Sequence, residues 1–359
     1  MITATKPFQP PLDEFKEKID EIYQNSWFTN HGPMVTELEK KLQSYFNVPY
    51  LALVTNGTIA IQIAIKALEL KGEIITTPFS YVATTSSIVW ENCIPRFADI
   101  NRQTLNIDPQ EIEKLINEKT SGILATNVFG YPCDFEPIKR ISEKFNIPVI
   151  YDNAHGFATK INGKDILNFG DISTISFHAT KLFHTIEGGA IVCHDEALYK
   201  KILRLRNFGH TSPNTFNGVG INGKMNEINS AMGLVNLNYI NEILEKRKKQ
   251  WLFYFESLNK TNLELMAYDL QKIEYNYSYF PIILKSENLV LKLLKELELH
   301  DVSARRYFNP SLNKLNYLPV IDHCEFSEDI SSRILCLPLY HELQTNEQNL
   351  IVNIIKSVC

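Results

Sequence analysis

The ten residues Ile172-Ser173-Thr174-Ile175-Ser176-Phe177-His178-Ala179-Thr180-Lys181 decide how this chain folds. The first six form a run rich in β-branched residues, which predicts a strand, and a polar turn then delivers Lys181. One strand earlier in the chain, the apolar run 147–151 ends directly in Asp152. Because ligands of open α/β sheets bind outside the carboxyl ends of the strands, Asp152 and Lys181 are predicted to face one crevice.

Strand and helix patterns alternate on both sides of this stretch. Strands are predicted at 50–54, 73–78, 122–128, 147–151, 172–177 and 190–193, and a further strand ends within 96–100. Helices are predicted at 59–70, 135–144 and 196–206, and the helical region before residue 46 is interrupted by a structured loop at 27–33. Such alternation predicts an α/β fold with a mostly parallel central sheet covered by helices.

The pattern changes near residue 250. A long helical pattern runs from 225 to about 258, and its basic run 246–249 is interpreted as a solvated face. Further strands are predicted at 276–284 and 302–308, and further helices at 287–298 and 345–358, the last with a capping box that begins at Thr345. We therefore predict two domains: a large α/β domain over 1–249 and a smaller C-terminal α+β domain over 250–359.

The composition excludes several classes of protein. A chain of 359 residues with 44% hydrophobic residues can bury a large core, and its net charge of -5 argues against a general nucleic-acid binder. The six cysteines form no CxxC pair and no His/Cys ligand spacing, so reduced thiols and no metal site are predicted. No stretch is long and apolar enough to cross a membrane. These features predict a soluble, cytoplasmic enzyme.

A lysine and an aspartate at one crevice suit pyridoxal 5'-phosphate, which needs an amine for a covalent bond to its aldehyde and an anion for its pyridine nitrogen. Taken alone, the pair fits a surface lysine and a helix-capping aspartate equally well. The segment 218–223 matches GxGxxG, but the polar, loop-like residues before it exclude the dinucleotide-binding fingerprint, which requires a preceding strand.

Three separated motifs strengthen the cofactor interpretation. They are Asp152-x-Ala154-His155, Ser176-Phe177-His178-x-Thr180-Lys181 and Glu187-Gly188-Gly189-Ala190. In this order they resemble the DegT/StrS-type nucleotide-sugar aminotransferases, which are pyridoxal-phosphate enzymes of fold type I. The similarity runs from Asn30-His31-Gly32-Pro33 to Leu335-Cys336-Leu337-Pro338, nearly the whole chain.

The resemblance implies a role for each candidate site residue. Lys181 bonds covalently to the cofactor and moves the proton, and Asp152 keeps the pyridine nitrogen protonated. The other implied cofactor contacts are Gly57, Thr58 and Ser176 at the phosphate, Tyr81 stacked on the ring, His155 near the phenolic oxygen, and Asn222 reaching the phosphate of the partner subunit in a homodimer with shared active sites. The turn at Gly57 and Thr58 also suits a phosphate by itself, because it opens a helix N-terminus. Most relatives carry a histidine at the position of Asn127, so no role is assigned to that residue.

Within the family, the stretches 130–134, 221–227 and 304–308 resemble the enzymes that form dTDP-viosamine. The implied reaction moves an amino group from L-glutamate to carbon 4 of dTDP-4-keto-6-deoxyglucose. Lys224, Arg305 and Arg306 are candidate cations for the diphosphate, Asn30 is a candidate substrate contact, and Tyr277, Tyr279 and Phe280 are candidates for stacking on the base. Amination at carbon 3 or of another nucleotide-linked ketohexose remains open.

Two other functions compete with this interpretation. Sugar dehydratases of the same superfamily replace the covalent lysine with histidine, so Lys181 argues against them. A non-catalytic sensor with this fold would be expected to have lost some of the chemical residues, yet Asp152, His155, Ser176 and Lys181 are all present. An aminotransferase is therefore favoured.

Overall fold

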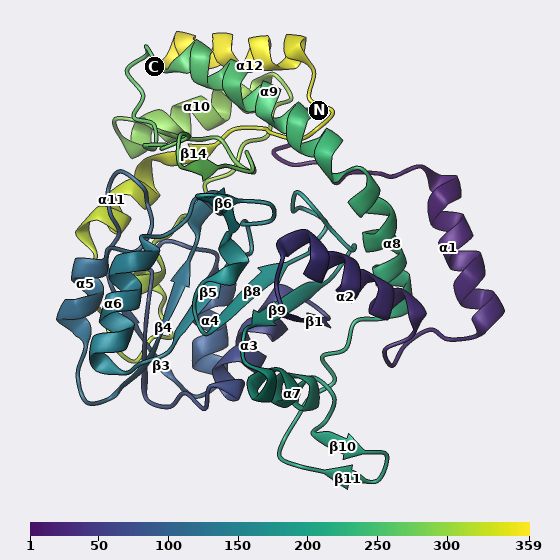
Figure 1. The fold of residues 1–359 in the computed structure, drawn as a ribbon. Helices are drawn as coiled ribbons and strands as arrows, with labels where there is room; N and C mark the ends of the chain where they lie inside the picture. The colour runs from purple at the N-terminus through teal and green to yellow at the C-terminus, as the bar shows by residue number, and fades with distance from the viewer.

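A seven-stranded sheet forms the centre of the computed structural model, which describes residues 1–359 (Figure 1). In spatial order its strands are β1 (Tyr50–Val54), β9 (Gly189–Cys193), β8 (Ile172–Ser176), β5 (Val149–Asp152), β4 (Thr120–Thr126), β2 (Glu73–Thr76) and β3 (Ile94–Phe97). Only β9 runs antiparallel to its neighbours, and all other pairs are parallel. The predicted mostly parallel sheet is confirmed.

Helices cover both faces of this sheet. One layer contains α3 (Gly57–Ala67), α4 (Val82–Trp90) and α7 (Glu196–Leu205); the other contains α2 (Pro33–Phe46), α5 (Pro109–Leu115), α6 (Phe135–Phe145) and α8 (Glu227–Asn238). Within β2, Ile74 packs into the first layer and Ile75 into the second. Successive side chains of a strand point to opposite faces, so the strands of a sheet that is buried on both sides are mostly apolar along their whole length. This makes β1, β5 and β9 recognisable as mostly apolar runs, whereas β8 also buries the polar residues Ser173 and Thr174.

The C-terminal part adds helices to a small antiparallel sheet. In it, β13 (Pro281–Ile283) pairs with β14 (Ile334–Cys336), and the helices are α9 (Ile240–Leu258), α10 (Glu287–Leu299), α11 (Glu325–Arg333) and α12 (Thr345–Val358). Figure 1 places α9, α10 and α12 above the large sheet, with α9 continuing upward from α8. The predicted boundary between residues 249 and 250 lies inside α9, so this helix belongs to both parts of the chain.

The remaining elements lie at the periphery. They are α1 (Leu12–Asn25), β6 (Lys160–Ile161), β7 (Lys164–Asp165), β12 (Ile273–Glu274), and the hairpin of β10 (His210–Ser212) and β11 (Thr215–Phe216). The hairpin projects away from the body of the chain at the end opposite the C-terminal part (Figure 1). None of the helices combines the length and the apolar character that a membrane crossing requires.

Of the two strands predicted in the C-terminal part, the first was too long and the second was wrong. The segment 276–284 forms a strand only over β13, because the Asn276 amide donates to the carbonyl of His155 at 2.7 Å and Tyr277 adopts a positive φ of 54°. The segment 302–308 forms no strand and has only isolated bridges from Val302 to Ile2 and from Arg305 to Cys336. In both places contacts with distant parts of the chain override the local β propensity.

The predicted helices were closer to the structure. The region from 225 to 258 forms two helices, since α8 ends before Tyr239 and α9 starts after it. The last helix has its predicted span, but its capping box begins one residue earlier than predicted: the Glu347 carboxylate accepts from the backbone N–H of Gln344 at 2.8 Å.

One residue of the basic run 246–249 departs from the predicted solvated face. Lys246 and Lys249 are exposed and pair with glutamates one turn earlier on α9. Arg247 is instead only 4% exposed, because it points inward from α9.

Candidate active site

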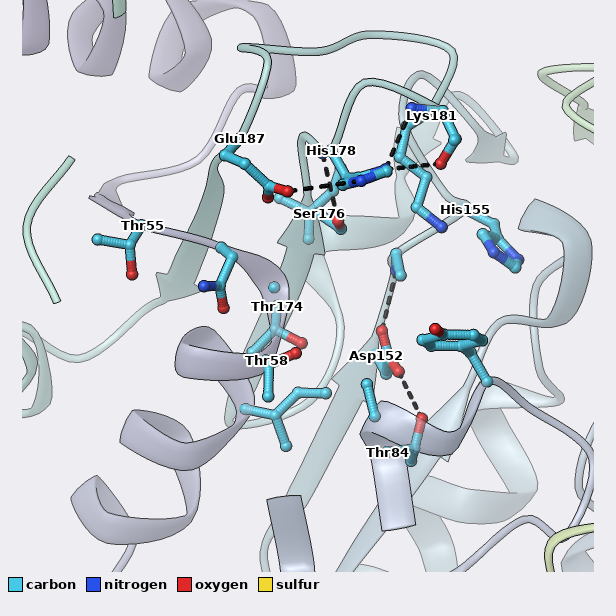
Figure 2. A pocket seen from close by; sticks show the side chains of 18 of the residues that line it. Thr55, Thr58, Thr84, Asp152, His155, Thr174, Ser176, His178, Lys181 and Glu187 are labelled. Atoms are coloured by element: carbon cyan, nitrogen blue, oxygen red, sulfur yellow. Dashed lines mark hydrogen bonds and ion pairs between the residues drawn. The ribbon is translucent and has the colours of Figure 1, made fainter. Parts of the chain in front are cut away.

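The carboxyl ends of two neighbouring parallel strands meet at one cavity. Asp152 is the last residue of β5 and Ser176 the last residue of β8. The chain after β8 forms a tight turn in which the Lys181 N–H donates to the carbonyl of His178 at 2.8 Å. This turn directs Lys181 back over the strand ends, and Figure 2 shows Lys181 and Asp152 on the same side of the pocket.

The cavity measures about 770 Å³ and contains most of the predicted site residues. Those that line it are Gly57, Thr58, Tyr81, Asp152, His155, Ser176, Lys181 and Arg305. Asn30, Asn222, Lys224 and Arg306 do not line it. The cavity is built from the ends of β4, β5 and β8, the N-termini of α3, α4 and α8, and one segment of the C-terminal part.

Asp152 is a buried carboxylate held in a fixed orientation. One oxygen accepts from the Ala154 N–H at 3.0 Å, and the other accepts from the Thr84 hydroxyl at 3.0 Å (Figure 2). Burial raises the pKa of Asp152, whereas these two hydrogen bonds and the positive charge of Lys181 lower it. The environment thus partly offsets the cost of a buried negative charge next to the lysine.

Lys181 is an amine with a strongly changed acidity. Burial lowers the pKa of its ammonium group to about 8, and the nearby Arg305 charge acts in the same direction. Asp152 opposes this shift because it stabilises the charged form. An amine with a pKa near 8 provides the unprotonated nitrogen that a nucleophile or general base requires near neutral pH.

The N-terminus of α3 forms a cradle for an anion. The Asn56 side chain caps the helix by accepting from the N–H of Ile59 at 2.9 Å, so Gly57 and Thr58 lie in the first turn, where backbone N–H groups are free. A Cβ atom on Gly57 would lie 2.9 Å from Cβ of Ser176. Glycine is therefore required at this close approach of α3 to β8.

Aromatic and polar groups complete the wall. Tyr81 precedes α4 and is 56% exposed at the cavity. His155 is buried with its ring centroid 4.6 Å from that of Tyr279, and burial lowers its pKa well below the ordinary value. His155 is therefore neutral near pH 7. At the rim, His178 lies 3.4 Å from the Glu187 carboxylate (Figure 2).

The other predicted substrate residues lie elsewhere. Arg306 donates to Glu287 at 2.7 Å and to the Ser332 carbonyl at 3.0 Å. Lys224 donates to Asn222 at 2.9 Å, in the segment of chain that follows the hairpin of β10 and β11. Asn30 is exposed in the loop before α2. Of the three aromatic candidates for base stacking, Tyr279 and Phe280 are buried in the C-terminal core, and Tyr277 packs against Trp251.

Sequence reasoning missed several residues that line the cavity, most clearly Thr84 and Thr174. Thr84 lies three residues after Tyr81, so both belong to one face at the start of α4, and that spacing was a usable signal. Thr174 lies two residues before Ser176 on β8 and points to the same face, and its hydroxyl has no partner within the chain. The period of two along the strand could have identified it.

Comparison with known proteins gives a consistent result. The chain is 42% identical to a dTDP-4-amino-4,6-dideoxy-D-glucose transaminase of Shigella dysenteriae, over 99% of both chains. It is 36% identical to an Escherichia coli protein of the same name, over 99% of this chain and 97% of that one. The crystal structure of DesI in the presence of its TDP-sugar product superimposes with a TM-score of 0.94 at 25% identity, covering 99% of this chain and 92% of DesI.

The family assignment follows from these matches and from a family profile. The profile of the DegT/DnrJ/EryC1/StrS aminotransferase family matches residues 12–356. The family resemblance seen in the sequence and the fold type that it implied are thus confirmed. The chain belongs to the DegT/DnrJ/EryC1/StrS aminotransferase family.

Proposed function

We propose that the chain is a pyridoxal-phosphate-dependent aminotransferase that moves an amino group from L-glutamate to carbon 4 of dTDP-4-keto-6-deoxyglucose. The product is dTDP-4-amino-4,6-dideoxyglucose (dTDP-viosamine), a deoxyamino sugar of the kind used in O-antigen lipopolysaccharide biosynthesis. The observation that carries the proposal is the presence of Lys181 and Asp152 in one cavity, each acting on the charge of the other.

The residues at the cavity fit pyridoxal phosphate. Gly57, Thr58 and Ser176 would hold the phosphate, because Gly57 leaves the free N–H groups of α3 open beside Ser176. Tyr81 would cover one face of the ring, and Asp152 would pair with the pyridine nitrogen. When bound, this cofactor supplies an electron sink that stabilises negative charge at the α-carbon of an amino acid.

The protein contributes positioning and proton movement. In the first half of the exchange, Lys181 Nζ would take the proton from the donor's α-carbon and pass it to the bound cofactor. In the second half it would carry a proton in the reverse direction and deliver it to carbon 4 of the sugar. The Asp152 carboxylate, oriented by Ala154 and Thr84, keeps its negative charge directed at one point of the cavity. Arg305 is the predicted cation that lines the cavity, where it can pair with a carboxylate or diphosphate.

The substrate follows from the relatives and is the part most easily tested. Two relatives that are 42% and 36% identical over nearly full length carry the name of this reaction. We expect a panel of keto-sugar nucleotides with L-glutamate to give the 4-amino product from dTDP-4-keto-6-deoxyglucose, identified by NMR. Amination at carbon 3, or preference for another nucleotide-linked ketohexose, would replace this substrate, and no reaction with any of them would favour a sensor.

We propose further that the enzyme acts as a homodimer with shared active sites, in the cytoplasm, without nucleic-acid or membrane partners. Exposed apolar side chains on α1 and the loop after it support an interface: Leu12, Tyr23, Trp27 and Phe28. Asn222 and Asn30 lie outside the cavity of their own chain, which suits residues that serve the partner's site.

Subunit mixing tests this shared site. Lys181→Ala and Asn222→Asp are each expected to inactivate the enzyme, the second because a carboxylate repels the cofactor phosphate. Hybrid dimers would contain one site with both native residues, so mixing the two variants is expected to restore part of the activity. Mixtures that stay inactive after confirmed subunit exchange would place Asn222 in its own chain's site or outside catalysis.

Thr84→Val is expected to lower kcat roughly tenfold, because it removes one hydrogen bond that orients Asp152. Thr84→Ser is the matched control, since it keeps the hydroxyl and should retain activity near that of the native enzyme. Steady-state kinetics with saturating substrates measures both. Equal loss in the two variants would attribute the effect to packing.

The acidity of Lys181 predicts a pH dependence. Only the unprotonated amine reacts, so the rate of reductive methylation of Lys181 in cofactor-free protein should rise with pH and level off above about 8. Exposed lysines should continue to gain reactivity toward about 10.4. Arg305→Met removes a charge that lowers the Lys181 pKa, so its inflection should move to higher pH. Peptide mass spectrometry gives the rates, and an unmoved inflection would contradict this role of Arg305.

A further inference from the structure

Arg247 is a buried guanidinium group without a carboxylate partner. It points inward from α9, is 4% exposed, and forms no ion pair. Its Nη1 donates to the Ser278 carbonyl at 3.1 Å, but its Nε–H has no partner within the chain. Because an unsatisfied donor on a buried charged group is costly, Arg247 requires a further acceptor.

A second, much smaller cavity shares several lining residues with the active-site cavity and is also lined by Arg247. It measures about 10 Å³ as space for the centre of a water molecule, and its lining includes Arg247, His155, Lys181 and Ser278. The Nδ1 atom of His155 is also buried without a partner in the chain. The two unpartnered nitrogens, Nε of Arg247 and Nδ1 of His155, thus belong to residues that line the same small cavity.

These features fit one bound water. A volume of about 10–15 Å³ measured in this way accommodates a single water, which needs two to four polar partners. Arg247 can only donate hydrogen bonds, whereas one nitrogen of a neutral histidine accepts and the other donates. A water between them accepts from Arg247 with its oxygen. The positive charge of Arg247 disfavours an N–H of His155 that points toward it and favours a lone pair there, so we expect the water to donate to Nδ1 and Nδ1 to be the accepting nitrogen.

We propose that Arg247 is a positioning residue that acts on His155 through one bound water and thereby holds the ring proton of His155 on Nε2. The backbone around His155 is already fixed by this part of the chain, since Asn276 and the Ser278 hydroxyl both donate to the His155 carbonyl, at 2.7 and 3.3 Å. Arg247 fixes Ser278 in turn through the Ser278 carbonyl. The water completes this set of contacts by selecting the tautomer.

The consequence for catalysis rests on the proposed function. His155 lines both cavities. Its Nδ1 is buried without a partner, whereas its Nε2 is not, and we therefore assign Nε2 to the large cavity. A proton on Nε2 makes His155 a hydrogen-bond donor there, which suits the phenolic oxygen of the cofactor. The tautomer itself needs neither cofactor nor turnover, so it can be tested separately.

The test is an ¹⁵N NMR spectrum of the histidine rings in perdeuterated full-length protein, with and without pyridoxal phosphate. His155→Gln identifies the His155 signals by their loss. Native protein is expected to show a protonated Nε2 and a bare Nδ1 in both states. A protonated Nδ1 in the native protein would overturn the proposal without affecting the aminotransferase assignment.

Arg247→Met should remove the preference for this tautomer and lower kcat/KM roughly tenfold, whereas Arg247→Lys, which keeps a donor, should restore part of both. Lys249→Met is the matched control: it removes a charge from the same run on α9, but at an exposed residue paired with Glu245, and should leave tautomer and activity unchanged. If Arg247→Met does not fold, the His155 tautomer in the spectra of the native protein and of Arg247→Lys still tests the proposal. An unchanged His155 tautomer in a folded Arg247→Met variant would exclude the role of Arg247.

Discussion

Lys181→Ala is expected to abolish transamination, with a loss of roughly 10,000-fold or more, because in the proposed function one side chain serves as both nucleophile and proton carrier. No other lysine lines the large cavity, so no second amine can substitute for it. The absorbance of the lysine-bound cofactor should disappear together with turnover. Steady-state kinetics and an absorption spectrum of the purified variant measure the two effects.

Lys200→Ala is a suitable control for this variant. Lys200 is an exposed lysine on α7 that pairs with Glu196, so its loss should change neither the spectrum nor the rate. If Lys181→Ala retained the absorbance band and activity, the covalent bond to the cofactor would have to form at another amine, and the assignment of this cavity would be wrong.

Asp152→Asn is expected to lower kcat roughly 100- to 1,000-fold while the cofactor still binds covalently. The amide has nearly the same shape: its oxygen can still accept from the Ala154 N–H, while its NH2 group can donate to the Thr84 hydroxyl, so the cavity should keep its geometry. The substitution removes the negative charge that, in the proposed function, would stabilise a protonated pyridine nitrogen. The absorption spectrum reports binding, and single-turnover kinetics with L-glutamate reports the chemical step.

The same substitution at Asp195 provides the matched control. Asp195 caps α7 by accepting from the N–H of Leu198 at 2.7 Å, and it lies outside the cavity. Asp195→Asn should therefore leave kcat unchanged. Activity close to the native value in Asp152→Asn would refute the electrostatic role of this carboxylate.

The sequence predicted the central sheet well because its strands are short, buried on both faces and separated by helical patterns. The predicted strand at 190–193 and the observed β9, Gly189–Cys193, differ by one residue. It predicted the C-terminal part less well: the apolar residues of 302–308 indicated a strand, yet this segment forms only isolated bridges. Alternation alone does not reveal which backbone groups find a partner strand.

The site shows the same division. Asp152 and Lys181 were predictable because each follows a strand end, and parallel strands bring their carboxyl ends to one edge of the sheet. Arg305 was predicted from charge and lines the cavity, whereas Arg306, its neighbour with the same chemistry, pairs with Glu287 outside it. Neighbouring residues of one type can point to opposite sides of a chain, and sequence does not distinguish them.

The sequence by itself determined the fold class and the placement of Lys181 and Asp152 at one edge of the sheet, because these depend on local periodicity and on the order of strands. The tertiary structure alone decided two other features. Thr84 orients Asp152, and Arg247, although it belongs to a basic run that predicts a solvated face, is buried and lines the same small cavity as His155. Both decisions depend on contacts between segments far apart in the chain. Such contacts arise only when α4 and α9 pack against the loops at the ends of the strands.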